Sequence, residues 1–181
     1  MIEYHSNNIK GRLDYIDLIN YCLTNFKKIH KADDIVSEFR TKVFDVTDTP
    51  EQQMMRSMEG TYPGWQGHSF IFQEDNRFSG VFDLDFVGNT LANFRAQLFA
   101  KGFFSFSNIN KKYASVLGFI TNIYDKGIDK IYVYDKIWYD KNEGLVISLS
   151  KMKRPRPYLT LTITAEEYAQ SVINLLQNHD S

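Results

Sequence analysis

Two acidic residues near position 84 form the pattern in this chain that is best suited to chemistry. Asp83 and Asp85 flank Leu84 in a run that alternates apolar and polar residues, and alternation along a β-strand places both carboxylates on one face, about 7 Å apart between Cα atoms. Oxygen ligands at this spacing suit Mg²⁺ or Mn²⁺ bound with waters and a substrate phosphate, as in phosphoryl-transfer enzymes and nucleases. An antiparallel sheet with one solvated face produces the same pattern, so a structural role is the alternative.

One histidine adds to this hypothesis. His68 precedes the first strand of the acidic hairpin, and if it lies near Asp83 it could act as a general base. The other histidines have no second ligand at metal-binding spacing, and they are His5, His30 and His179. The enzyme hypothesis therefore depends on Asp83, Asp85 and His68, with Mg²⁺ or Mn²⁺ as the cofactor.

Two other segments carry residues suited to contacting a partner. Residues 60–67, GTYPGWQG, must form a loop because three glycines and a proline interrupt it, and its aromatic residues Tyr62 and Trp65 could either anchor a partner or fold back onto the core. Residues 151–157, KMKRPRP, form a basic turn that could meet an acidic protein, or could remain solvated and protect a sheet edge. The cations of this turn are Lys151, Lys153, Arg154 and Arg156.

The elements that must position these residues are mainly strands. Residues 128–140, 144–151 and 157–164 are rich in β-branched and aromatic residues, and short turn-forming segments separate them. Connections this short leave no room for a crossover helix, so the three runs predict an antiparallel meander. A second pair of strands, His68–Gln73 and Gly80–Phe86, forms a hairpin around residues 74–77.

Helical periodicity and capping signals predict about six helices around this sheet. They cover residues 13–26, residues 31–44, a segment that starts at Pro50 with Thr49 as its cap, residues 91–102, a segment that starts after Asn108 and ends at Gly127, and a last segment that starts after Thr164. The predicted class is α+β, with a mainly antiparallel sheet of about five strands in a single domain of residues 1–181. Strands and helices do not alternate one for one, which argues against a doubly wound nucleotide-binding fold.

Composition narrows the compartment and the partners. The single cysteine, Cys22, rules out an intramolecular disulfide and a multi-cysteine zinc site, and the sequence has neither an apolar run long enough to span a bilayer nor a secretory leader. We therefore expect a cytoplasmic protein with no membrane partner. The net charge of −1 is too balanced to favour nucleic acid, but it is unevenly spread. Residues 1–100 hold 10 Lys and Arg against 14 Asp and Glu, whereas residues 101–181 hold 11 against 8.

These features favour a non-enzymatic, cofactor-free module that binds another protein through a sheet edge, the aromatic loop and the basic turn. Such a small α+β domain resembles, in general type, the immunity proteins that bacteria pair with toxins. The resemblance implies a cognate toxin as the partner and neutralisation by complex formation as the function. The metal-dependent enzyme centred on Asp83 and Asp85 is the alternative.

Overall fold

A single antiparallel sheet organises the molecule. The computed structural model describes residues 11–26, 32–59, 64–102, 104–131, 133–152 and 156–179, and within them eight strands follow the order β1-β2-β3-β4-β8-β7-β6-β5. The strands are β1 (Phe44–Asp45), β2 (Trp65–Gln73), β3 (Phe78–Val87), β4 (Thr90–Ala100), β5 (Ile128–Ile131), β6 (Tyr134–Asp140), β7 (Leu145–Met152) and β8 (Tyr158–Ala165). The helices are α1 (Tyr15–Asn25), α2 (Ala32–Lys42), α3 (Pro50–Glu59), α4 (Ser105–Tyr124), the short 3₁₀ helix η1 (Glu166–Tyr168) and α5 (Gln170–His179).

The sheet consists of two halves that meet at its centre. Strands β1 to β4 are neighbours in the order of the chain, and so are β5 to β8, while α4 carries the chain from one half to the other. The two halves join where β4 pairs with β8, with Phe94 opposite Ile163 and Leu98 opposite Leu159. The halves are therefore built from local pairings, and the β4–β8 pair makes them one sheet.

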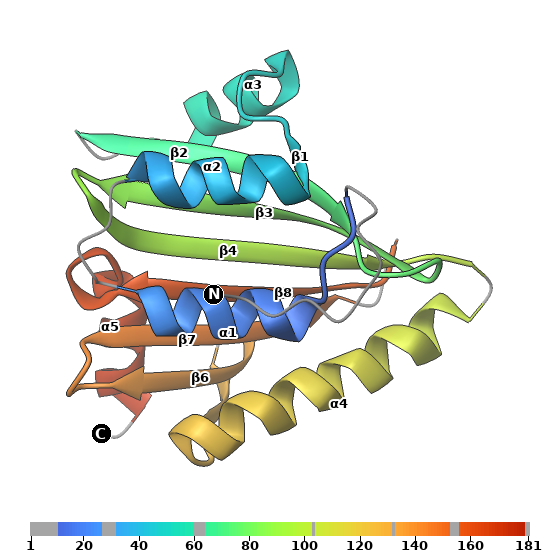
Figure 1. The fold of residues 1–181 in the computed structure, drawn as a ribbon. Coiled ribbons are helices and arrows are strands. Elements are labelled where there is room, and N and C mark those ends of the chain that lie inside the picture. The colour runs from blue at the N-terminus through green and yellow to red at the C-terminus, as the bar shows by residue number, and fades with distance from the viewer. Residues whose placement is uncertain are drawn as a thin grey trace.

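Helices cover one face of the sheet and leave much of the other face open (Figure 1). Helices α1, α2 and α4 lie on one face, where their buried side chains and those of β2, β3, β4, β7 and β8 form most of the main core. Helix α5 lies on the opposite face, over a smaller apolar cluster that includes Ile137, Val146, Ile173 and Leu176. Along β3 and β8 the buried residues of the core face alternate with half-buried residues, the pattern of a sheet with one solvated face.

The β2 edge of the sheet is largely covered. The short strand β1 pairs with Phe70 and Ile71, and the backbone N–H of Val46 donates to the Ser69 carbonyl at 2.9 Å. Residue 11 accepts a hydrogen bond from the Gln73 N–H at 2.6 Å. These contacts satisfy backbone groups that would otherwise be available to a partner strand, so this edge offers little for strand addition.

The structure confirms the α+β class, the antiparallel hairpin and the antiparallel meander. The predicted helix over residues 91–102 is wrong, because these residues form β4 in the middle of the sheet. Leu, Ala, Arg and Gln favour helices, but pairing with β3 on one side and β8 on the other outweighs that preference. This strand, β1 and the division of residues 128–140 into β5 and β6 raise the number from about five strands to eight.

The last helix also starts later than predicted. Thr164 is not a helix cap, since it lies in β8 and pairs with both Asn93 and Val146. The chain leaves the sheet at Ala165, makes the 3₁₀ turn η1 and enters α5 at Gln170.

Candidate partner-binding surface at the basic end of the sheet

The two predicted carboxylates do lie on one face, on the open side of the sheet, but each has protein partners. Asp83 accepts hydrogen bonds from the Ser69 hydroxyl at 2.5 Å and from Arg95 Nε and Nη2 at 3.2 and 3.1 Å. Asp85 accepts from Asn93 Nδ2 at 2.8 Å. The Arg95 guanidinium offsets the negative charge that would attract a divalent cation, and no three His, Cys, Asp or Glu side chains of the described residues gather closely enough to hold a metal ion. These side chains form a row of hydrogen bonds across the neighbouring strands β2, β3 and β4.

His68 is on the other face of the sheet. It pairs with Leu84 in the β2–β3 register, whereas Ser69 pairs with Asp83, so its side chain points away from both carboxylates. Its ring lies edge-on to Phe86, with 6.1 Å between ring centroids. The structure therefore does not bring His68 to Asp83, the arrangement that a general-base role would require.

The predicted aromatic anchors are only partly described. Tyr62 lies outside the described residues, and Trp65 is the first residue of β2, not a loop residue. Trp65 is half-buried and its ring meets Tyr168 of η1 edge-on, with 5.3 Å between centroids. Trp65 therefore packs within the molecule at the end of the sheet where β3 and β8 finish.

The predicted basic turn is also only partly described. Lys153 and Arg154 lie outside the described residues, while Arg156 is exposed. Lys151 is half-buried and binds α4, because its Nζ donates to Asn110 Oδ1 at 2.9 Å and lies 4.4 Å from the centroid of the Tyr113 ring. Its ammonium thus fastens α4 to β7, and Arg156 is the described cation of this turn that faces solvent.

The structure places Arg156 near a cluster of cations that the sequence analysis did not single out. The backbone of Pro157 accepts a hydrogen bond from the Ala100 N–H at 3.2 Å, which sets the start of β8 beside the end of β4. The N–H of the next residue, Lys101, donates to the carbonyl of Arg77 in the β2–β3 turn at 2.7 Å. We call this region, where the β2–β3 turn, the end of β4, the start of β8 and the start of α4 meet, the basic end; it is on the right in Figure 1.

The basic end contains a hollow of about 500 Å³. Among the described residues its lining includes three cations and no acidic side chain, and these residues are Asn76, Arg77, Lys101, Gly102, Phe104, Ser107, Asn108 and Lys111. Asp75 offsets part of the Arg77 charge, since Arg77 Nε and Nη2 donate to its Oδ2 at 2.9 and 2.7 Å. Burial tends to raise the pKa of Asp75, but the hydrogen bonds from Arg77 and the backbone outweigh it and lower the pKa. Lys101 and Lys111 have no ion-pair partner among the described residues.

The start of α4 adds to the positive potential. This helix begins at Ser105 without a hydrogen bond from a capping side chain and with no acidic residue in its first turn. The N-terminus of a helix carries a partial positive charge from its aligned peptide dipoles. Helix and side chains therefore both favour an acidic group at the hollow.

Two aromatic side chains project beside these cations. Phe104 is 69% exposed and Phe106 is 45% exposed, although both flank the first turn of a helix whose later residues Ile109 and Val116 are buried. Exposed aromatic residues among cations are typical of protein-binding surfaces, where the aromatic group supplies the apolar contact and the cations select an acidic partner. The basic end therefore offers both an anchor and a charged rim.

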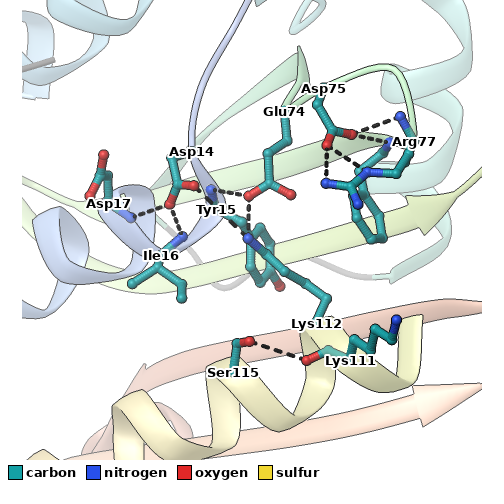
Figure 2. Close-up of polar contacts among 11 residues, drawn as sticks. Asp14, Tyr15, Ile16, Asp17, Glu74, Asp75, Arg77, Lys111, Lys112 and Ser115 are labelled. Carbon is teal, nitrogen blue, oxygen red and sulfur yellow. Dashed lines mark hydrogen bonds and ion pairs between the residues drawn. The ribbon is translucent and has the colours of Figure 1, made fainter. Parts of the chain in front are cut away.

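A half-buried ion pair between Glu74 and Lys112 holds this end in place (Figure 2). The Glu74 carboxylate accepts hydrogen bonds from the Tyr15 N–H at 3.1 Å and from Lys112 of α4, and Asp14 caps α1 beside them. Burial raises the pKa of Glu74, although the hydrogen bond and charge of Lys112 oppose this shift. The contact links the β2–β3 turn to α1 and α4. Lys112 is therefore structural, while its neighbour Lys111 lines the hollow.

Fold and surface together define an α+β protein with an eight-stranded antiparallel open sheet and a basic, aromatic end. Comparison of the chain with models of known protein families, with curated protein sequences and with solved structures found no match. No helix among the described residues is long and apolar enough to span a membrane.

Proposed function

We propose that this protein is a non-enzymatic binding module that forms a complex with another protein, and that the basic end is the surface that meets an acidic face of that partner. The observation that carries the proposal is the hollow of about 500 Å³, whose described lining has three cations, the exposed Phe104 and no acidic residue. The open polar face is less suited, because its carboxylates are already engaged by Arg95 and Asn93.

A protein fits this surface better than nucleic acid does. A phosphate backbone is usually met by a stripe of many cations on a strongly basic domain, whereas this chain has a net charge of −1 and its cations form one compact cluster. A toxin is the partner that the general resemblance to immunity proteins suggests. The surface itself requires that the partner present acidic residues around an apolar patch.

The charge requirement can be tested with model peptides in a fluorescence-polarisation titration. The first peptide carries Glu and Asp around one central Phe, the second replaces its acids with Lys, and a single-stranded thymidine oligonucleotide represents nucleic acid. We expect the acidic peptide to bind about tenfold or more tightly than the basic one, with affinity falling as salt rises. Tighter binding of the oligonucleotide, or equal binding of both peptides, would contradict the proposal.

A matched pair of variants locates the effect. Lys101→Glu with Lys111→Glu should slow association several-fold and flatten its salt dependence, because cations at a rim steer the encounter. Lys126→Glu with Lys141→Glu makes the same change in net charge beyond the other end of α4, where both lysines are exposed, and should have little effect. If both double variants weaken binding equally, the attraction is general and the basic end is not the site.

The aromatic anchor should behave differently from the rim. Phe104→Ala should leave association nearly unchanged and accelerate dissociation, at a cost of about 2 kcal/mol if Phe104 is a central contact. Because Phe104 is 69% exposed, its removal should change the melting temperature of the free protein only slightly. A large fall in the melting temperature would instead assign Phe104 to the core.

A further inference from the structure

A second pocket lies at the far end of α4 from the basic end. It has a volume of about 710 Å³ and opens where the end of α4, strand β6 and helix α5 come together. Its apolar lining includes Ile128, Ile137, Ile173 and Leu176. Pockets that bury small ligands are typically of this size and lined in this way.

Aromatic rings and carboxylates form another part of the pocket wall. Tyr124, Trp138 and Tyr139 line it together with Asp125 and Asp140. Asp140 Oδ1 accepts the backbone N–H groups of residues 142 and 143 at 2.9 and 3.1 Å. Its second oxygen makes no hydrogen bond with the described residues and remains available to a ligand.

One lysine of the chain also lines the pocket, Lys141. Lys141 Nζ lies 5.9 Å from the centroid of the Tyr139 ring, within the range at which a cation is attracted to an aromatic face. The charges of Asp140 and Glu143 also act at Tyr124, where they add to burial in raising the pKa of the phenol. Lys126 is adjacent in sequence, but it does not line the pocket.

The wall beside α4 is fixed by close backbone contacts. The carbonyl of Asp125 accepts a hydrogen bond from Trp138 Nε1 at 3.2 Å. A Cβ atom at Gly127 would lie 2.6 Å from the same nitrogen and 2.8 Å from the Ile137 carbonyl oxygen. These contacts set the aromatic wall in one position before any ligand arrives, which lowers the cost of binding.

We propose that this pocket binds a small molecule with an apolar body and a protonated amine, whose ammonium group meets the carboxylates of Asp125 and Asp140 in competition with the ammonium group of Lys141. The isoleucines and Leu176 receive the apolar body. The site is separate from the basic end and selects the opposite charge.

The test is an NMR titration of the ¹⁵N-labelled protein with 4-phenylbutylamine, 4-phenylbutan-1-ol and 4-phenylbutyrate, which share one apolar body and differ in charge. The chain has two tryptophans, so the Trp138 indole signal reports on the pocket and the Trp65 signal serves as an internal control. We expect the amine to shift the Trp138 signal and to bind about tenfold more tightly than the alcohol, with no saturable shift from the carboxylate.

Two variants decide whether the carboxylates and Lys141 act as proposed. Asp140→Asn retains Oδ1 for the turn and removes the charge, so it should weaken the amine several-fold and leave the alcohol unchanged. Lys141→Ala removes the competing ammonium and should tighten amine binding several-fold, a gain that damage to the fold would not produce. Equal affinity for amine and alcohol, no shift of the Trp138 signal, or an equal shift of both indole signals would overturn the proposal.

Discussion

Glu74 and Asp75 are adjacent in the β2–β3 turn, yet the fold shifts the pKa values of their carboxyl groups in opposite directions. Burial dominates at Glu74 and raises its pKa above the usual 4.5. Hydrogen bonds from Arg77 and the backbone dominate at Asp75 and lower its pKa below the usual 3.8. One turn thus contains two acids with opposite effects on stability.

The two acids should give opposite pH dependences. A raised pKa means that Glu74 stabilises the fold fully below its unfolded-state pKa, near 4.5, and that this contribution is lost as pH rises through the folded-state pKa. Compared with Glu74→Gln, the wild type should therefore lose unfolding free energy between about pH 4 and 7. Compared with Asp75→Asn, it should lose unfolding free energy as pH falls below 3.8, because the Asp75 contribution exists above its unfolded-state pKa.

Urea unfolding of the three proteins from pH 3 to 7 measures both effects. If the wild type instead gains unfolding free energy relative to Glu74→Gln as pH rises, the Lys112 ion pair outweighs the burial of Glu74. The pH dependence therefore shows which of the two effects controls this contact.

Asp125 has an unusual backbone conformation for a residue with a side chain. Its φ is 60° and its ψ is −153°, a region that is almost reserved for glycine and that costs about 1–3 kcal/mol otherwise. Asp125→Gly should relieve this strain. The greater freedom of glycine in the unfolded chain costs about 0.5–1 kcal/mol of unfolding free energy and offsets part of the gain. We expect a net gain of about 0.5–2 kcal/mol in unfolding free energy.

Asp125→Ala is the matched control, because it removes the carboxylate and keeps the strained backbone. The hydrogen bond from Trp138 ends on the Asp125 carbonyl and so is retained in both variants. If thermal melts gave the glycine variant no higher a melting temperature than the alanine variant, the backbone of residue 125 would not be strained.

At the level of the elements, local alternation correctly predicted which face a residue occupies, whereas pairing between distant segments could not be predicted. The alternation around Leu84 correctly places Asp83 and Asp85 on one face. Their partners Arg95 and Asn93 could not be predicted, because the segment that carries them has helix-favouring residues and becomes β4 only by pairing with strands on both sides. A period-two pattern of Phe94, Ala96 and Leu98 was the signal that could have identified this strand.

The basic end could not be predicted from the sequence for a related reason. Arg77, Lys101 and Lys111 belong to three different segments, and the topology brings the β2–β3 turn, the end of β4 and the start of α4 together. The predicted basic turn was a partial signal, since Arg156 lies at the same end of the sheet, whereas Lys151 is used to hold α4. Periodicity shows which face a residue occupies, but only the strand order shows which turns are neighbours.

At the level of the whole molecule, α4 separates two surfaces of different chemistry. Its start lies at the basic end, and its last residue lines the pocket with its aromatic and acidic wall. Residues 101–181 supply both surfaces with charge, since Lys101 and Lys111 line the hollow and Asp125 and Asp140 line the pocket.

The central pairing of β4 with β8 also has a consequence for how the chain folds. Phe99 and Tyr158 are opposite one another although they are 59 positions apart in the sequence, so this seam closes a long loop while the hairpins on each side close short ones. We expect the two halves to form first, each with one unpaired strand edge until the seam closes, and such edges join other chains readily. We therefore expect the refolding yield to fall as the protein concentration rises, while native protein stays monodisperse at the same concentrations. A refolding yield that does not depend on concentration would show that β4 and β8 pair before the exposed edges can join other chains.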